Sequence, residues 1–438
     1  MPADQWASWL ATRSDAEIRW LEQKLPTPSA GQSCTVANAA GDLSFAVVVL
    51  ADVADVLALA QARSALTVAD YRPVAWSEQS DVLALARGWA LDGYRFERYL
   101  SSPSSPGARL IVNDKGLNIE LAAIFTVRDL VNTPTEDLGP QQLAAAAKAL
   151  ADGSGGQCSV ITGDDLLDQN YPAVHAVGRA ATTPPCMIEL SWIKADQPHL
   201  ILVGKGVCYD TGGLNLKPGA GMRLMKKDMG GAAHVLGLAQ WLVESGFPAS
   251  LTVLIPAVEN SVAGNAYRPG DVIPTRAGLS VEIGNTDAEG RVVLSDALTR
   301  AGELAPDLVI DFATLTGAAR IALGPDLPAL YARQDATSKA ILDQGIAHHD
   351  PLWSMPLHQP YSEYLKSPIA DISNMASTPM AGSVTAALFL DRFVAADLDW
   401  VHVDVYAWNP RTLPGHPEGG EAQGLRAMYH AIQQRFAR

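Results

Sequence analysis

The sequence predicts an α/β protein with two domains. Its 438 residues are enough for two or three domains at roughly 150 residues each. Hydrophobic residues make up 48% and charged residues 18%, a composition typical of folded globular chains. Beyond residue 140, short β-branched runs alternate with longer amphipathic runs, as strands and helices do around a mostly parallel sheet. We expect a small N-terminal α/β domain (1–125) and a larger C-terminal α/β domain (126–438) with a central, mostly parallel sheet flanked by helices.

The first domain is predicted from apolar periodicity. The run 43–50 predicts a strand, and residues at helical spacing predict three helices, over 53–63, 81–91 and 118–130. The segment 101–107 is rich in Ser, Pro and Gly, which favour turns. It is too short to separate independently moving domains. Pro134 disfavours helix at the preceding residue, so the boundary is expected shortly before it.

The second domain is expected to hold most of the sheet. Its strand candidates are 200–207, 251–256, 308–313 and 400–405. Helices are expected over 231–245 and 292–304, between the first three of these strands. In the second helix, Leu294, Ala297, Leu298 and Ala301 recur at helical spacing, so this helix can cover one face of the sheet.

The charge balance argues against two classes of partner. Lys and Arg number 32 and Asp and Glu 47, which gives a formal net charge of −15. Such a surface repels nucleic-acid phosphates and anionic lipid, and the sequence contains no basic tract. No apolar run approaches the ~18 residues of a membrane span, and residues 1–5 do not begin a signal peptide. We therefore expect a cytosolic protein with reduced cysteines, no membrane and no nucleic acid.

Two polar segments interrupt the apolar scaffold at expected strand or helix ends, where open α/β sheets hold their binding sites. In the first segment (204–219), a Gly-rich loop carries Lys205, Asp210 and Lys217. In the second (226–234), Asp228 is expected at the start of a helix, where its charge suits the helix dipole.

A third polar segment (285–291) holds three alternating charged residues, Asp287, Glu289 and Arg291. In extended backbone they would project from one face. Taken singly, each segment is explained by a turn, a helix cap or a surface ion pair. Taken together, four carboxylates at strand ends would repel one another unless cations neutralise them. Two divalent metals sharing carboxylates would do so, and such pairs activate water.

These segments resemble the leucyl aminopeptidase (cytosol aminopeptidase) family of dinuclear metallo-exopeptidases. The string Asn-Thr-Asp-Ala-Glu-Gly-Arg at 285–291 is essentially the family signature. The motifs Gly204-Lys205-Gly206 and Asp228-Met229-Gly230-Gly231-Ala232-Ala233 stand in the family's order and spacing. The resemblance extends from about residue 127 to 409 and is highly specific, whereas the N-terminal part matches only loosely.

The resemblance implies a set of metal ligands and an activity. Asp210 and Glu289 would bridge two metals, Lys205 and Asp228 would complete the shell of one, and Asp287 would serve the other. The ions expected are zinc or manganese, with magnesium and cobalt as alternatives. The implied reaction is removal of the first residue from peptides with a free N-terminus, by water that the metals activate.

The resemblance also assigns catalytic and substrate-binding residues. Lys217 would stabilise the oxyanion, and Arg291 would hold a bicarbonate ion that acts as general base. Met225, Thr314 and Leu315 would contact the substrate, in a pocket whose apolar preference suits leucine. A homohexamer of two stacked trimers is the implied assembly.

Two rival functions stay open. Some bacterial family members bind DNA, so a DNA-binding or architectural protein with secondary or lost peptidase activity is one alternative, against which the negative charge counts. A catalytically dead relative is the other, although every expected ligand is present. Cys208-Tyr209 replaces the more usual Thr-Phe beside Asp210, a departure that bears on side-chain preference and metal choice and touches none of the expected ligands.

Overall fold

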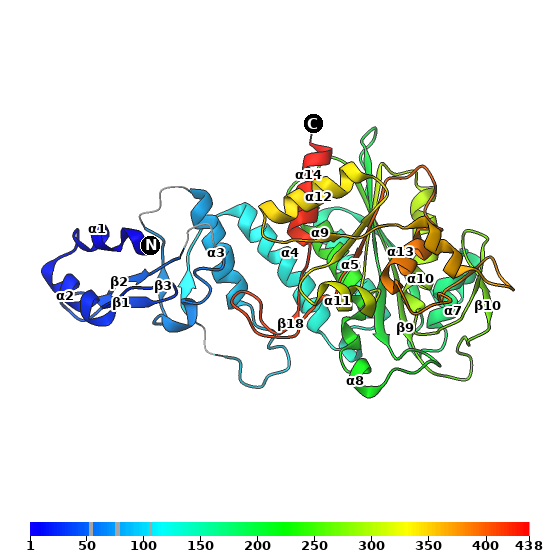
Figure 1. Cartoon of the computed structure of the whole chain (residues 1–438), viewed down its shortest axis with the longest axis horizontal. Coiled ribbons are helices and arrows are strands. Elements are labelled where there is room, and N and C mark those ends of the chain that lie inside the picture. The colour runs from blue at the N-terminus through cyan, green and yellow to red at the C-terminus, as the bar shows by residue number, and fades with distance from the viewer. Residues whose placement is uncertain (52–55, 75–78, 105–106, 438) are drawn as a thin grey trace. The chain divides into compact units, whose positions relative to one another are not determined.

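The computed structural model describes residues 1–51, 56–74, 79–104 and 107–437, and these fall into two compact units (Figure 1). The first unit comprises Met1–Leu121 and Pro410–Glu418, and the second comprises Ala122–Asn409 and Gly419–Arg438. Among the helices of the described residues, none is both long enough and apolar enough to cross a bilayer.

The first unit contains two small sheets and short helices. Strands β1 (Ser33–Ala37) and β2 (Leu43–Val48) pair antiparallel, and β3 (Asp70–Tyr71) and β4 (Arg109–Leu110) pair parallel. The helices are α1 (Trp6–Leu10), α2 (Asp15–Lys24), α3 (Gln79–Gly93) and the start of α4 (Lys115–Asn132). Helix α2 begins where Ser14 and Glu17 form a capping box, each side chain accepting from the other's backbone N–H.

The helix expected over 53–63 is wrong where the structure describes it. Residues 52–55 lie outside the described residues, and 56–62 form successive turns that lead into a 3-10 helix, Arg63–Ala65. The backbone N–H groups of Ala60 and Ala62 bond to the carbonyls of Leu57 and Leu59, three residues back. This i→i+3 pattern is tighter than the α-helical one, so apolar spacing alone misidentified the segment.

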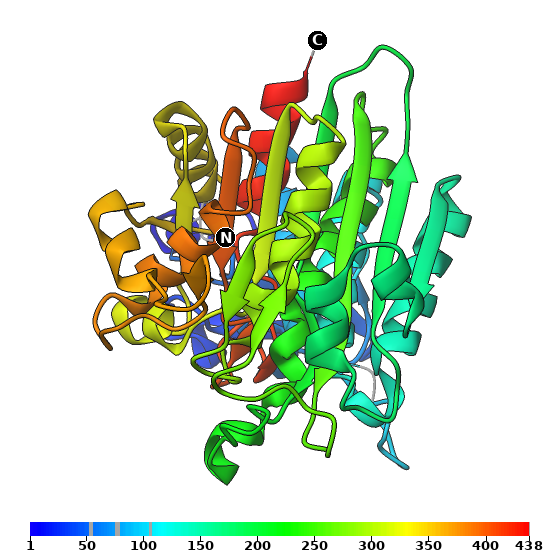
Figure 2. The same cartoon turned by 90° about the vertical axis from the view of Figure 1, so that its right-hand side faces the viewer.

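The second unit is built on a nine-stranded sheet in the order β14-β13-β16-β12-β7-β9-β6-β5, with β8 paired to β9. Its centre is parallel, because β16, β12, β7 and β9 run in one direction. On the two sides, β13 pairs antiparallel with β16, β6 pairs antiparallel with β9, and β5 pairs antiparallel with β6. The predicted α/β class with a mostly parallel sheet is therefore confirmed (Figure 2). The strands are β5 (Gln157–Thr162), β6 (Cys186–Trp192), β7 (His199–Gly204), β8 (Gly206–Asp210), β9 (Ser250–Asn260), β12 (Leu308–Ala313), β13 (Ala329–Ala332), β14 (Trp353–Ser354) and β16 (Trp400–Asp404).

Smaller elements complete the second unit. A three-stranded sheet is formed by β10 (Val272–Pro274), β11 (Ser280–Glu282) and β15 (Ile372–Ser373), and a two-stranded sheet by β17 (Trp408–Asn409) and β18 (Gly419–Gly420). The helices are α5 (Pro140–Ser154), α6 (Asp165–Asp168), α7 (Pro172–Gly178), α8 (Gly219–Met222), α9 (Gly230–Glu244), α10 (Glu289–Glu303), α11 (Gly317–Leu323), α12 (Asp335–Ala347), α13 (Gly382–Asp391) and α14 (Leu425–Phe436).

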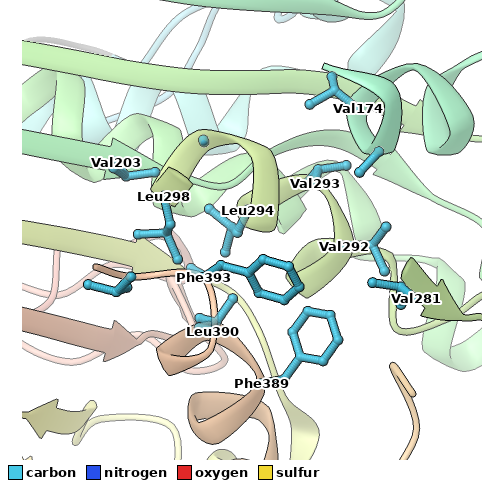
Figure 3. Packing of buried hydrophobic residues seen from close by; sticks show 14 of the residues in the cluster. Val174, Val203, Val281, Val292, Val293, Leu294, Leu298, Phe389, Leu390 and Phe393 are labelled. Carbon is cyan, nitrogen blue, oxygen red and sulfur yellow. The ribbon is translucent and has the colours of Figure 1, made fainter. Parts of the chain in front are cut away.

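Helix α10 packs in the main hydrophobic core of the second unit. Leu294 and Leu298 of α10 are buried in one cluster with Val203 of β7, Phe389 of α13 and Phe393, which follows α13 (Figure 3). The predicted apolar stripe of this helix is therefore confirmed. Helix α9 contacts β7 and β12, with α5 and α14 packed beside it. Burial of this stripe fixes the position of the first turn of α10, which enters the site described below.

The apolar run 200–207 is not one strand, because the chain leaves the sheet pairing at Lys205. The Lys205 N–H bonds to Phe312 O of β12, at 3.0 Å, and its carbonyl accepts from Ala232 N of α9, at 2.9 Å. After this break, β8 pairs with β9 alone. The side chain of Lys205 is thereby placed at the carboxyl end of the central strands.

Candidate metal centre

The polar residues of the site lie at the carboxyl ends of four neighbouring strands. Lys205 follows β7, Asp210 ends β8, Asn260 ends β9 and Thr314 follows β12. Because parallel strands bring their carboxyl ends to one edge, segments more than a hundred residues apart meet there. The structure thus brings the first polar segment of the sequence to the same place as the other two.

Lys205 lies at the centre of a buried cluster of charges. Its Nζ is 2.7 Å from Asp228 Oδ2 and 3.0 Å from Glu289 Oε1, and it donates to the carbonyl of Thr314 at 2.9 Å. Burial alone would lower the pKa of this amine, but Asp228, Glu289 and Asp210 outweigh it and raise the pKa. In the metal-free chain, Lys205 is therefore the cation that balances these carboxylates.

Lys217 balances the other two carboxylates. Its Nζ lies 2.8 Å from Asp210 Oδ2 and 2.5 Å from Asp287 Oδ1. Asp210 is held in place through its second oxygen, which accepts from Gly212 N and from Asn260 Nδ2, both at 2.8 Å. The loop before Lys217 is tight, because Gly212 has a φ of +89° and a Cβ there would lie 2.5 Å from Asn215 O.

The segment 285–291 is not extended, so the expected alternation along one face is wrong. Residues 286 and 287 form a turn, and Glu289 is the first residue of α10. A carboxylate in the first turn of a helix is favoured by the helix dipole. Asp287 and Glu289 converge because the turn and the helix start aim them at Asp210, and Arg291 follows inside the helix.

Asp228 is likewise not the cap of α9. It lies in a 3-10 turn, Met225–Met229, and the residue at the cap position is Met229. The hydroxyl of Thr314 is 2.8 Å from both the backbone O and Oδ1 of Asp228. Asp228 is therefore held by the loop after β12 rather than by the dipole of its own helix.

Sequence reasoning missed the residues that hold the acidic segments in place. Buried Asn260 donates from Nδ2 to Asp210 and to the carbonyl of Thr286, at 2.8 and 3.0 Å. Asn374 accepts from Gly284 N at 2.8 Å, donates to Asn285 O at 2.7 Å, and its carbonyl accepts from Arg291 Nη1 at 2.9 Å. A polar residue directly after an apolar strand was a usable signal for Asn260, whereas nothing in its local sequence marks Asn374.

Three carboxylates form an arrangement that fits a metal ion. One oxygen from each of Asp210, Asp287 and Glu289 lies within 4.8 Å of the others. Burial and the neighbouring Asp210 raise the pKa of Glu289 well above its usual value, and the same two causes raise the pKa of Asp287. Glu289 Oε2 is buried and accepts no hydrogen bond from any residue that the structure describes. An unpartnered carboxylate oxygen among other carboxylates is a donor set suited to divalent cations.

The cluster forms one wall of a cavity of about 590 Å³. All ten residues that the sequence pointed to contribute to its lining: Lys205, Asp210, Lys217, Met225, Asp228, Asp287, Glu289, Arg291, Thr314 and Leu315. Lys227, Arg320 and Tyr406, which the sequence did not single out, also line it. The cavity is large enough to hold part of a peptide beside the carboxylates.

Arg291 is buried in this wall with one donor free. Its Nε is buried and donates to no acceptor among the described residues. Burial lowers the pKa of its guanidinium to about 10, against the opposing effect of Glu289 and Asp404. A guanidinium with an unused donor beside a cavity can bind a small planar anion.

Two family profiles match the chain and together span most of it. The profile described as "Cytosol aminopeptidase family, catalytic domain" matches residues 125–429. The profile described as "M17 aminopeptidase, N-terminal domain" matches residues 1–113.

Relatives and solved structures give the same result. The chain is 38% identical over 374 residues to a probable cytosol aminopeptidase of Syntrophotalea carbinolica, covering 81% of this chain and 75% of that one. It is 40% identical over 369 residues to peptidase B of Pectobacterium carotovorum, covering 80% and 82%. The crystal structure of cytosol aminopeptidase from Coxiella burnetii superposes with a TM-score of 0.95 at 43% identity, covering 100% and 96% of the two chains.

A further solved structure contains a metal. The bottromycin maturation enzyme BotP, determined in complex with Mn, has a TM-score of 0.85 and 33% identity, covering 93% of this chain and 94% of that one. The fold and the matches define the class of the chain, which is a metallo-aminopeptidase and therefore a hydrolase. It belongs to the cytosol aminopeptidase family.

Proposed function

We propose that this chain removes the N-terminal residue from peptides with the help of two divalent metal ions, with a preference for apolar first residues such as leucine. The observation that carries the proposal is the convergence of Asp210, Asp287 and Glu289 within 4.8 Å, beside two lysines and a cavity. Family membership supports the reaction class, and the manganese in the relative BotP supports a metal of this kind.

Five side chains would hold the metal ions. Asp210 and Glu289 would be shared between the two ions, Lys205 and Asp228 would belong to one, and Asp287 to the other. When bound, the ions supply a water that is nucleophilic at neutral pH. Lys205 must bind as a neutral amine, and the charge of an adjacent divalent cation favours that form. Zinc or manganese is the proposed pair, with magnesium or cobalt as alternatives.

The remaining residues would bind and polarise the substrate. The carboxylate of Asp228 would receive the free α-amine, which restricts the reaction to N-termini. Lys217, at the cavity wall, would donate to the oxyanion that develops at the first peptide carbonyl. The free donor of Arg291 would hold a bicarbonate ion, which would accept the proton of the attacking water. Met225, Thr314 and Leu315 would contact the first side chain.

We further propose a setting for this activity. Catalysis is assigned to residues 126–438, with residues 1–125 as a separate N-terminal domain. The names of the relatives support a cytosolic location, and a homohexamer is the proposed assembly. Light scattering tests the assembly, since a clean monomer would contradict it.

The central experiment pairs metal content with hydrolysis of leucyl p-nitroanilide. We expect Glu289→Gln to lose bound metal, and its turnover to fall about a thousandfold or more. Lys217→Ala should keep the metal but lose about 10²–10³ in turnover, as removal of an oxyanion donor does. Lys339→Ala, which breaks the exposed ion pair with Asp343, is the matched control and should change neither quantity. No hydrolysis by metal-loaded wild-type protein would overturn the proposal.

A further inference from the structure

The cavity contains cations that its own carboxylates do not neutralise. Lys205 is paired with Asp228 and Glu289, and Lys217 is paired with Asp210 and Asp287. These two lysines already engage the four carboxylates that line the cavity. Lys227 and Arg320, which also line it, form no ion pair with any described residue. Their charges are therefore available to a bound molecule.

Lys227 is the more unusual of the two, because it is only 5% exposed. The polar contact of its ammonium is with the face of Tyr406, whose ring centroid lies 5.0 Å from Nζ. This Nζ donates no hydrogen bond to a described residue. The residue as a whole is nearly buried, but its Nζ is not enclosed by the protein, so an ammonium without an anionic partner is open to the cavity that Lys227 lines.

Arg320 faces the same aromatic ring. Its Cζ lies 4.7 Å from the centroid of Tyr406, so one ring is in contact with two cations. Two like charges this close repel each other unless an anion lies near both. A ring face attracts a cation only weakly compared with a carboxylate.

Asp404, an acidic residue that acts electrostatically on Lys227 without lining the cavity, forms its hydrogen bonds elsewhere. Asp404 accepts from the backbone N–H of Leu315 and of Thr316 at 3.0 and 3.2 Å, and from the Thr316 hydroxyl at 2.6 Å. Its oxygens therefore fix the loop after β12 and do not pair with Lys227. Among the described residues no carboxylate forms an ion pair with Lys227 or Arg320, so a bound molecule can supply their anion.

We propose that Lys227 and Arg320, which both contact the ring of Tyr406, form a subsite that binds a carboxylate group of the substrate. This inference rests on the proposed peptidase function and adds a substrate class to it, acidic or very short peptides. Two sources of carboxylate are compatible with the cavity. One is the acidic side chain of the first residue, beside Met225 and Thr314, and the other is the free C-terminus of a dipeptide.

The test compares substrates that differ only in this charge. In the first arm, glutamyl p-nitroanilide is compared with glutaminyl p-nitroanilide. In the second arm, the dipeptide Leu-Leu is compared with Leu-Leu amide. In at least one arm we expect the wild-type enzyme to show a kcat/KM about tenfold or more higher for the anionic member, the size typical of a buried charge-assisted contact. The arm that shows the preference identifies the source of the carboxylate.

Variants then locate the preference. Lys227→Met, which keeps the length and removes the charge, should reduce the ratio of anionic to neutral kcat/KM to near one, and Arg320→Gln should reduce it in the same arm. The matched control is Lys226→Met. Lys226 does not line the cavity, and its Nζ donates to Asn132 O at 2.5 Å, so its removal should leave the ratio unchanged. Thermal unfolding of each variant checks that it is folded.

The outcomes separate the two proposals. Hydrolysis of the neutral substrates without preference in either arm would overturn the carboxylate subsite and leave the peptidase function standing. A preference that survives in both Lys227→Met and Arg320→Gln would also overturn the subsite. No hydrolysis of any of the four substrates would overturn the peptidase function and the subsite with it.

Discussion

At the scale of single residues, the position of Lys205 depends on a glycine in the facing helix. A Cβ on Gly290 would lie 2.6 Å from Lys205 Cε and 2.7 Å from Nζ. Only the absence of a side chain at position 290 lets the amine reach Asp228 and Glu289. In the family signature this glycine follows the second acidic residue and precedes the arginine. The close approach of Lys205 is a physical reason for a glycine at this position.

Replacing this glycine should damage the site and spare the fold. Gly290→Ala must push the Lys205 amine away from the carboxylates, so we expect turnover on leucyl p-nitroanilide to fall about a hundredfold. Alanine is otherwise favoured over glycine inside a helix by about 1 kcal/mol, so the melting temperature should not collapse. Gly302→Ala in the same helix is the control, because its Cβ would meet no atom closer than 3.5 Å. Equal activity of the two variants would contradict this account of Lys205.

At the scale of elements, apolar runs predicted the central strands well. The run 308–313 matches β12 residue for residue, and 400–405 differs from β16 only at its end. The sequence could not show the break at Lys205, because Val207 and Cys208 continue the apolar pattern after it. The hydrogen bonds that divide the run come from β12 and α9, and such long-range partners leave no mark in local periodicity.

The site was predictable to the same extent. Charged residues in short polar segments pointed to the acidic cluster, which the parallel sheet brings together. The segment 285–291 was misread as extended, because helix α10 begins at Glu289, earlier than its apolar stripe starts. Asn374 was missed because it lies far from the acidic segment in the sequence. Its side chain bonds to the backbone groups of Gly284 and Asn285.

The paired strands β12 and β16 contain a buried charge pair. Asp311 and His402 are opposite each other in the register, and Nδ1 of His402 lies 2.6 Å from Asp311 Oδ1. Trp400 Nε1 donates to the other oxygen at 2.7 Å. Burial lowers the pKa of His402, but the Asp311 carboxylate outweighs this and leaves the pKa above its usual value.

We expect Asp311→Asn to destabilise the protein by about 3–5 kcal/mol, as removal of one partner of a buried pair does. The loss should depend on pH. A raised histidine pKa contributes stability that is fully present below the unfolded value of about 6.5 and lost as the pH rises through the folded value. Guanidinium unfolding of wild type and variant at pH 6 and pH 9 should therefore show the larger difference at pH 6. An equal or larger difference at pH 9 would contradict a charged His402.

At the scale of the whole molecule, the proposed ions would connect segments from both halves of the second unit. The five proposed ligands range from Lys205 to Glu289 and come from five separate elements or loops. A ligand that binds only the folded state stabilises it by mass action. Metal occupancy and stability should therefore change together.

Chelation should lower the thermal unfolding midpoint and abolish hydrolysis together. Free metal at about 100 times its Kd adds about 2.7 kcal/mol to the folded state, so adding Mn back should restore both quantities. Calorimetry with and without chelator measures the shift. The matched control is Glu289→Gln, whose midpoint should respond to neither treatment. A wild-type midpoint that ignores the chelator would argue against an ion at this cluster.

The first turn of α10 carries Glu289, and the next turns of the same helix insert Leu294 and Leu298 into the main core. We therefore expect the acidic cluster to assemble only when α10 has formed and packed into this core. A chain in which α10 is unfolded would lack Glu289 at the cluster, so we expect it to have no peptidase activity. We therefore expect a newly synthesised chain to gain peptidase activity only after this domain has folded.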